Sequence, residues 1–365
     1  MNSPSTNPVD PVSALIDDPS GAARDAARAG TRVIGYYGND IPVALILAAG
    51  ALPVRLRAAP RGPTARADLY LESAHSPELR ALVEQWLAGE LDFIETVIFP
   101  RSDDSAQRVY YYLCELQRRG ACAGPRPLLY DVAGIGRPVS VDYTRESTRR
   151  LARDLGASEE RLPQALRRVA DREKLLSDLR ARCAADPPLP GSLAWAVVRA
   201  SGCDWRETFD DGARRWLDDA TSLPGARRIL LAGDLLPDAS LHVAIESAGG
   251  SVVLELTESA ADEDAASSPL LDTLADHFHA RRTPVRAMRE DAHWAVRNAR
   301  NGHADAVVFW LVEEDESLPW EIARQMRSLA TAGIPALALT RQSWKPDRMA
   351  LQRVGEFAAG GESQS

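Results

Sequence analysis

The stretch RVIGYYGNDIPVALILAAGALPVRL, residues 32–56, decides the fold. It begins with a strand-like apolar run and passes through a short polar loop to a proline and a helix-like apolar run. After an Ala-Gly pair it ends in a second strand-like run. This order predicts a βαβ unit with two parallel strands. Gly38 stands where the loop leaves the first strand, so it either makes a turn or occupies a position where something used to be bound.

The same alternation continues to about residue 142. ETVIFP (95–100) and RPLLYDV (126–132) have the apolar, β-branched character of strands, and DSAQRVYYYLCELQRRG (104–120) between them is long enough for a helix. Short strands that alternate with helices of ten or more residues are typical of a parallel sheet. We therefore predict a first α/β lobe over residues 31–142.

Strand signals disappear in the next segment, residues 143–222. Leucines such as Leu155, Leu162 and Leu166 recur there at steps of about three or four residues, which indicates amphipathic helices. These helices could form a coiled coil with a partner, or they could pack against their own protein. The pattern is short and Pro163 interrupts it, which favours the second interpretation. We predict a helical connecting region here.

A second alternating segment covers residues 223–357. Its beginning, RRILLAGDLLPDASLHVAIESAGGSVVLEL (227–256), lines up with residues 32–56 as strand, polar loop, proline, helix, Ala-Gly and strand. Helices are expected around 240–250 and from Leu270, Glu290 and Leu318, and strands at RRILLAG (227–233), SVVLEL (251–256), TPVRA (283–287), ADAVVFWLV (304–312) and IPALALT (334–340). An old duplication explains the likeness. The predicted fold class is α/β: two similar doubly wound parallel-sheet lobes, joined by a helical region, with a cleft between them.

The two ends of the chain look different. Residues 1–30 are rich in Ser, Pro, Asn, Asp and Ala, and the last residues read AAGGESQS. Such composition is typical of segments that bury little apolar surface. We predict a loose N-terminal tail over residues 1–30, with one short helix at 10–16, and a loose C-terminal tail over residues 358–365.

Composition excludes several classes of protein. A net charge of −9 over 365 residues argues against nucleic acid or an anionic membrane as the main partner. The longest apolar run, residues 41–54, is too short to cross a bilayer. Four cysteines at irregular spacing do not suggest a disulfide framework, and no secretory signal is visible. A cytoplasmic protein is expected.

Polar side chains gather in loops that follow predicted strands, where ligands bind in open parallel sheets. No phosphate loop, Gly-rich dinucleotide fingerprint or Gly-x-Ser-x-Gly motif occurs in the sequence. His277 and His279 are two residues apart, so on a helix they face different sides and do not suit a metal pair. The candidate loops are residues 38–40, 102–104, 233–234 and 313–316.

The chain resembles the subunits of 2-hydroxyacyl-CoA dehydratases and of the related benzoyl-CoA reductases. The likeness runs from about residue 33 to residue 357. It is carried by GYYGNDIPVALILAAGALPVRL (35–56), VIFPRSDDSAQRVYYYL (97–113), GDLLPDASLHVAIESAGGSVV (233–253) and DAVVFWLVEEDESLPWEIARQMRSLATAGIPALAL (305–339).

Three cysteines hold a 4Fe–4S cluster in that family. The resemblance places them after the first strand, before the aspartate that follows FP, and after a strand near the end of the second lobe. The matching residues are Gly38, Asp103 and, to within one residue, Glu314. None is a cysteine, and a cluster of this kind needs thiolates. The resemblance therefore implies that Gly38 stands where the family keeps a ligand, and that the cluster is absent.

Two functions remain open. The first is a dehydratase-like subunit without a cluster, which acts as an accessory or scaffold partner in acyl-CoA or aromatic-acid metabolism. The alternative is a related enzyme with altered, divalent-metal-dependent chemistry in the same cleft. Asp103, Asp104 and Glu314 are its candidate ligands, because carboxylates suit Mg²⁺ or Mn²⁺. Solvated acidic loops without a metal would equally explain these residues.

The resemblance also implies partners. The family works as two homologous subunits side by side, so we expect a cluster-bearing homologue (a heterodimer) or a second copy of this chain (a homodimer). An acyl-CoA is the implied ligand. No catalytic residue is identified by the sequence.

Overall fold

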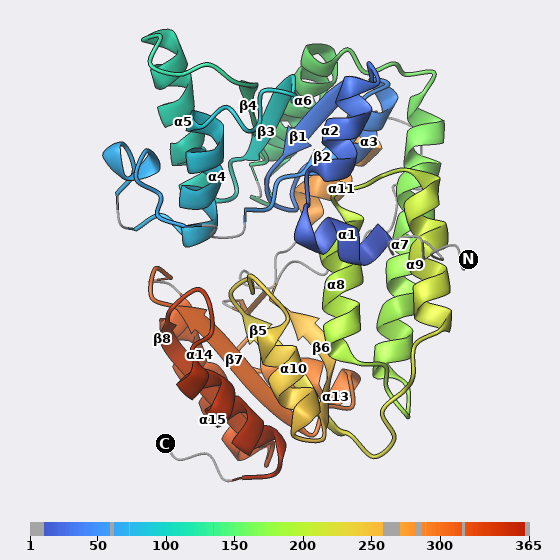
Figure 1. The fold of residues 1–365 in the computed structure, drawn as a ribbon, viewed down its shortest axis with the longest axis vertical. Helices are drawn as coiled ribbons and strands as arrows, with labels where there is room; N and C mark the ends of the chain where they lie inside the picture. Colours follow the sequence, from blue (N-terminus) through green and yellow to red (C-terminus); the bar gives the residue numbers. More distant parts are fainter. Residues whose placement is uncertain are drawn as a thin grey trace, which may run out of the picture.

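Two four-stranded sheets, each entirely parallel, form the centres of two lobes (Figure 1). The computed structural model describes residues 11–58, 62–72, 74–133, 135–257, 271–281, 287–288, 290–315 and 318–361. The strand order is β2-β1-β3-β4 in the first sheet and β6-β5-β7-β8 in the second. The equivalent order confirms the predicted α/β fold with two similar lobes.

The first sheet consists of β1 (Val33–Tyr36), β2 (Leu52–Arg55), β3 (Thr96–Pro100) and β4 (Arg126–Tyr130). Successive side chains of a strand point to opposite faces. Val97 and Phe99 accordingly join the hydrophobic core on one face, and Ile34 and Ile98 join the core on the other. Both faces are buried, as the continuous apolar runs require.

Helices cover both faces of this sheet. The first core contains α4 (Pro77–Leu87) and α5 (Asp104–Arg118), and the second contains α3 (Val43–Ala48). A short 3₁₀ helix (Ala67–Leu69) precedes α4. The helix α4 begins where Ser76 accepts a hydrogen bond from the backbone N–H of Leu79, which is the preferred chemistry of an N-cap.

The second sheet consists of β5 (Arg227–Gly233), β6 (Gly250–Leu256), β7 (Ala306–Val312) and β8 (Ala336–Gln342). Every residue of the central strand β7 is buried. One face packs against α10 (Ser240–Ser247) and α15 (Arg348–Ala358), and the other against α13 (Trp294–Asn301) and α14 (Leu318–Thr331). This is the doubly wound arrangement that the alternation of strands and helices indicates.

The helical region, which joins the lobes along one side, consists of α7 (Leu162–Ala184), α8 (Gly191–Ser201) and α9 (Glu207–Asp218) (Figure 1). The helix α6 (Pro138–Leu155), which the sequence placed in this region, packs against the first lobe instead. Leucines at helical spacing on α7 pack into a core shared with α8 and α9. The amphipathic pattern of this region thus packs within its own chain, as the second interpretation of the pattern expected.

Residues 11–28 differ from the loose tail that their composition predicts. They form α1 (Pro11–Asp17) and α2 (Gly21–Arg28). Val12 of α1 is fully buried in the core of the helical region, and Ala23 of α2 is fully buried in a core of the first lobe. A few apolar residues at helical spacing were sufficient to anchor both helices.

The helix α11 (Leu271–Ala280) lies against the first lobe, although its position in the sequence placed it in the second (Figure 1). Leu274 and Phe278 enter the first-lobe core that contains α3. Arg145 of α6 donates to Asp276, and Arg149 donates to Asp272, with shortest N–O distances of 2.6 Å in both pairs. The strand that precedes α11 and the helix that follows it belong to the second lobe. The position of α11 in the sequence therefore predicted the wrong lobe for it.

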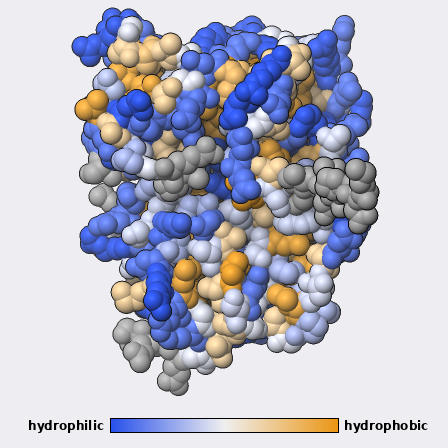
Figure 2. All heavy atoms as spheres, viewed as in Figure 1, coloured by the Kyte–Doolittle hydropathy of each residue, from blue (hydrophilic) through white to orange (hydrophobic). Residues whose placement is uncertain are grey.

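Some predictions fall outside the described residues. These are residues 1–10 of the predicted N-terminal tail, residues 362–365 of the predicted C-terminal tail, and residues 283–286 of the predicted TPVRA strand. Within the parts of the chain that the structure describes, no helix is both long and apolar enough to cross a membrane. On the face drawn in Figure 2, hydrophobic residues appear in small groups among hydrophilic ones.

Candidate functional site

A cavity of about 190 Å³ lies where the two lobes and the helical region meet. Asn39 and Arg57, which follow β1 and β2, line it from the first lobe. Leu235 and Thr257, which follow β5 and β6, line it from the second. The carboxyl ends of both sheets therefore face one space, which is where ligands bind in open parallel sheets.

The walls of the cavity are mainly apolar. Leu176 and Leu179 of α7 lie on one side, Trp195 and Val198 of α8 on another, and Phe278 of α11 closes a third. An apolar cavity with a few convergent polar groups is the usual form of a small-molecule site. Its position and lining make it the candidate site of this protein.

The charged groups that line the cavity are mostly cationic. The described lining contains two glutamates, Glu173 and Glu255, and six arginines. The chain as a whole carries a net charge of −9, so this cationic lining is a local feature that favours an anionic ligand. Two of the arginines, Arg57 and Arg199, are only 6% exposed. The six are Arg55, Arg57, Arg172, Arg180, Arg199 and Arg281.

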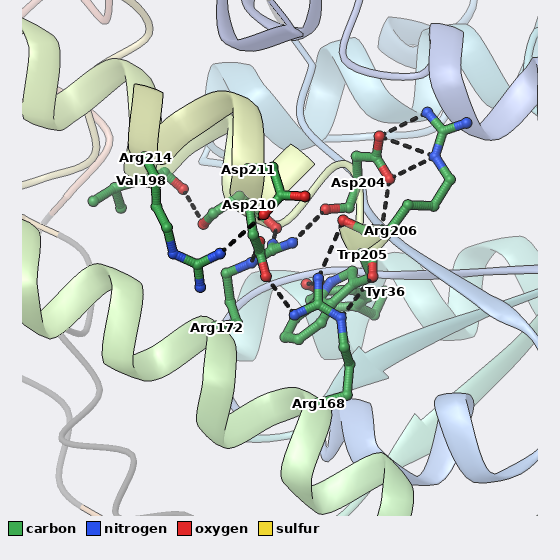
Figure 3. Close-up of polar contacts among 11 residues, drawn as sticks. Tyr36, Arg168, Arg172, Val198, Asp204, Trp205, Arg206, Asp210, Asp211 and Arg214 are labelled. Carbon is green, nitrogen blue, oxygen red and sulfur yellow. Dashed lines mark hydrogen bonds and ion pairs between the residues drawn. The ribbon is translucent and has the colours of Figure 1, made fainter. Parts of the chain in front are cut away.

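Arg172 holds the wall of the cavity together (Figure 3). Its guanidinium donates to a carboxylate oxygen of Asp210 at 2.6 Å, to the Asp204 carbonyl at 2.8 Å and to the Ser201 carbonyl. It also lies 4.8 Å from the ring centre of Trp205. Burial lowers the pKa of Arg172, and the negative charge of Asp210 opposes that change. One buried cation thus fixes the turn between α8 and α9.

The same turn is attached to the first sheet. The indole N–H of Trp205 donates to the Tyr36 hydroxyl at 3.4 Å, at the end of β1. The backbone N–H of Arg55, at the end of β2, donates to the Gly202 carbonyl at 2.7 Å. The Arg172 contacts therefore position the strand ends as well as the helices around the cavity.

Gly38 has a backbone φ of +72°, a left-handed conformation that glycine adopts without strain. A Cβ at this position would lie 3.2 Å from the Pro100 side chain. Gly38 therefore makes the turn that leaves β1, which answers the question raised by the sequence.

Asp103 lies in the loop that follows β3. In the same loop, the Ser102 hydroxyl donates a 2.6 Å hydrogen bond to the carboxylate of Asp40, which belongs to the loop of Gly38. Asp103 caps α5 by accepting from the Ala106 N–H at 2.9 Å. Burial raises the pKa of Asp103, and the N–H donors oppose that rise. A hydrogen bond thus joins the loops of Gly38 and Asp103, but Gly38, Asp103 and Glu314 do not line the cavity, and Asn39 does.

Glu314 lies at the carboxyl end of the second sheet, near Asp234 and Asp315. Asp315 accepts from the Leu318 N–H at 2.9 Å and so caps α14 as Asp103 caps α5. Because both residues cap a helix, Asp315 of the second lobe corresponds to Asp103 of the first. Asp315 comes one residue after Glu314, the position that the resemblance gave to within one residue. The three candidate metal ligands are divided between the lobes: Asp103 and the exposed Asp104 in the first, Glu314 in the second. The metal site stays a prediction, and Glu316 lies outside the described residues.

The carboxyl group of Asp234 has an unusual pKa. Burial, and after it the negative charge of Asp315, raises the pKa of Asp234 to about 8, although the Val312 N–H donates to it at 2.7 Å. A carboxyl with a raised pKa contributes its full stability below its unfolded pKa of about 4 and loses it as the pH rises through about 8. The fold is therefore expected to weaken over this range of pH.

Replacing Asp234 with asparagine should remove that weakening, because an amide oxygen still accepts from Val312 but cannot ionise. At about pH 8.5 the variant should be more stable than the wild type by about 2 kcal/mol, a discounted figure because the residue is partly exposed. At about pH 5 the two should be similar. Thermal unfolding at both pH values checks this, with Asp171→Asn on the exposed face of α7 as the control. An equal difference at both pH values would contradict it.

The four cysteines are distributed over the helices. Cys114 lies on α5 and Cys122 follows it, both partly exposed. Cys203 is buried, with its sulfur 3.6 Å from the Arg199 carbonyl. Cys183 lines the cavity, and burial raises its pKa to about 12, so it is a neutral thiol. Cys183 lies at the cavity because α7 passes beside it.

A known protein family matches the chain over most of the architecture described above. The family described as HGD-D, 2-hydroxyglutaryl-CoA dehydratase, D-component, matches residues 39–358. The chain belongs to this family. The match covers the first lobe from the loop after β1 onward, the helical region, the second lobe and every cavity-lining residue but Tyr36, so the chain is a 2-hydroxyacyl-CoA dehydratase-like subunit. No curated protein matches the sequence significantly.

Sequence reasoning missed the arginines of this dehydratase-like cavity. Arginine is ordinarily exposed, so Arg172 on an amphipathic helix gave no sign that it is buried. The available signal was Arg55 and Arg57, which follow one another at alternate positions at the end of a predicted strand. That spacing places them on one face, beyond the carboxyl end of the strand.

Proposed function

We propose that this chain is a 2-hydroxyacyl-CoA dehydratase-like subunit that works without a 4Fe–4S cluster of its own. It acts as an accessory or scaffold partner in acyl-CoA or aromatic-acid metabolism. The observation that carries the proposal is the pairing of an intact cavity with three strand-end positions that offer no thiolate. Gly38 makes a turn, Asp103 caps a helix, and Glu314 is a carboxylate.

These residues do not fit the cluster that the family implies. A cluster of this type is held by thiolates, and a glycine has no donor atom. Cysteine at position 38 would also carry a Cβ against Pro100 in a left-handed backbone conformation. Glycine at position 38 thus suits the left-handed backbone conformation there and offers no side-chain donor for a metal.

The cavity supports an acyl-CoA as ligand. An acyl-CoA carries phosphates at one end and an apolar acyl group at the other. Arginine binds phosphate through its planar fork of N–H donors, and Arg55 and Arg57 lie at the end of β2. The apolar walls that α7 and α8 contribute suit the acyl group.

The name of the family supports a partner. A D-component is one component of an assembly, and a cluster-bearing homologous subunit is the partner that the proposal requires. A homodimer is the alternative. The division of the carboxylates between the lobes, and the engagement of Asp103 as a helix cap, favour this function over the divalent-metal enzyme.

Anaerobic reconstitution with iron and sulfide tests the absence of a cluster. The purified chain should retain no stoichiometric iron and show no broad visible absorption band, whereas a homologous subunit with all three cysteines should retain about four irons. Mixing the two chains should give a stable complex by size-exclusion chromatography. Retention of about four irons by this chain, lost in Cys183→Ser or Cys203→Ser, would refute the proposal.

A further inference from the structure

Glu255 presents a carboxylate to the cavity from the carboxyl end of β6. Its side chain is 25% exposed. One carboxylate oxygen lies 2.9 Å from Nε2 of His242, and the other accepts a hydrogen bond from the Thr257 hydroxyl. Each carboxylate oxygen has a further lone pair, so both contacts leave room for a proton donated from the cavity. The side chain is therefore held in one orientation and can still accept a proton from the cavity.

His242 stands behind this carboxylate and is fully buried on α10. Its ring lies beside Trp195 of α8, with 6.5 Å between ring centres. Nδ1 has no hydrogen-bond partner among the described residues, so the contact with Glu255 is the one that orients the ring. Burying an ionisable pair is costly unless its groups are well hydrogen-bonded. The buried imidazole therefore holds the Glu255 carboxylate at the cavity, within reach of a proton on a bound ligand, as a general base requires.

A cation lies at the same corner of the cavity. Arg199 donates to the Leu236 carbonyl, just after β5, at 3.4 Å. Its guanidinium lies 5.3 Å from the ring centre of Trp195, the same indole that flanks His242. Arg199 lines the cavity from α8, and Glu255 lines it from the end of β6. A guanidinium and a carboxylate therefore line one cavity, with Trp195 beside Arg199 and beside the His242 that contacts Glu255.

We propose that Glu255 is a general base that removes a proton from the carbon next to the carbonyl of an acyl thioester bound in the cavity. The C–H bond breaks, its proton goes to Glu255, and its electron pair moves onto the carbonyl oxygen as an enolate. Arg199 stabilises the developing negative charge on that oxygen. The reverse step returns a proton to carbon, so the cycle needs no oxidant or reductant.

His242 is a positioning residue in this step, since it touches Glu255 and does not line the cavity. Thr257 lines the cavity and also orients Glu255 through its hydroxyl. The inference rests on the proposed binding of an acyl-CoA. It goes beyond that proposal because an accessory subunit needs no base. Without a cluster, proton transfer is the chemistry that the side chains of the cavity can perform by themselves.

Hydrogen exchange at carbon tests the proposal. The full-length protein is incubated with hexanoyl-CoA in D₂O, and proton NMR follows the loss of the signal from the carbon next to the thioester. Calorimetry measures hexanoyl-CoA binding separately. The wild type should bind and should exchange the proton faster than the protein-free solution. Glu255→Gln should bind within about twofold of the wild type and exchange at least about 100-fold more slowly.

Further variants separate catalysis from folding. Glu255→Asp should recover part of the exchange rate, and Glu160→Gln, on an exposed turn, should exchange as the wild type does. His242→Leu should lower the exchange rate at saturating ligand with Kd unchanged, while His242→Gln, which keeps a donor, should retain more of the rate. Equal loss of ligand binding in both His242 variants would assign His242 a structural role and contradict its positioning role.

The outcomes distinguish the two proposals. Binding of hexanoyl-CoA without exchange in the wild type would overturn the general base and leave the proposed ligand intact. Exchange in Glu255→Gln at the rate of the wild type would show that another group is the base, and would also overturn it. A wild type that binds no hexanoyl-CoA would overturn the acyl-CoA ligand and, with it, the inference.

Discussion

Replacing Arg172 with alanine is expected to lower the free energy of unfolding by about 3 kcal/mol. Arg172 is 1% exposed, and its loss leaves the carbonyls of Ser201 and Asp204 without their donor. Asp210 keeps one partner, because Arg168 donates to its other oxygen, so the cost falls at the lower end of the usual range for a broken buried pair. Urea denaturation followed by circular dichroism measures the loss.

Arg180→Ala is the matched control for this prediction. Arg180 lies on the same helix and lines the same cavity, but its side chain is 36% exposed and it pairs with Glu173 only at 3.7 Å. Its removal should cost less than about 1 kcal/mol. A second control, Arg172→Met with Asp210→Leu, should cost less than the sum of the single changes, because the uncompensated charge is removed. Equal effects of Arg172→Ala and Arg180→Ala would contradict the role given to the network.

Replacing Gly233 with alanine should be the most damaging single change at a strand end. Gly233 has a φ of +121°, and an added Cβ would lie directly against the carbonyl oxygen of Trp310 and 2.9 Å from its carbonyl carbon. Both atoms belong to the backbone of β7, which is paired with β5, so neither can rotate away. We expect a loss of about 4 kcal/mol or more, or no soluble protein.

Gly225→Ala separates backbone strain from this clash. Gly225 also has a left-handed conformation, with a φ of +71°, but nothing lies within 4 Å of its added Cβ. It should cost about 1–2 kcal/mol, the usual penalty for a side chain in this conformation. Thermal unfolding of the two variants compares them. If Gly233→Ala were no more destabilising than Gly225→Ala, the close approach of β5 and β7 would be wrong.

Much of the fold could be predicted from local pattern. The apolar run ADAVVFWLV predicted a strand with both faces covered, and β7 is buried along its whole length. The likeness of residues 32–56 to residues 227–256 predicted two similar lobes, and the sheets share one strand order. These features depend on residues close in sequence, whose periodicity is visible without the structure.

The parts that the sequence did not predict depend on distant partners. The helix α11 is held by Arg145 and Arg149, more than a hundred positions earlier in the chain. The short helix predicted at residues 10–16 is α1, but its anchoring by burial of Val12 against helices at residues 175–217 was not predicted. No local periodicity reports such contacts, because the same amphipathic helix can pack against either lobe.

The candidate site was also predicted only in part from the sequence. The strand-end rule predicted the correct edge of each sheet, where Asn39 and Leu235 line the cavity. It did not distinguish Glu255 from other glutamates, because the supporting His242 comes from another element and the burial of a charge is a tertiary property. Gly38 has a left-handed backbone conformation, which accounts for the turn that the sequence offered as one interpretation of this glycine.

The attachment of α11 to the first lobe bears on how the two repeats can evolve apart. Each repeat built its own sheet, but the first repeat completes its hydrophobic core with Leu274 and Phe278, which the second repeat encodes. A chain that ended before residue 271 would expose this apolar seam to water. The first half therefore depends on a helix that the second half encodes, so the first half cannot be inherited alone with its core complete.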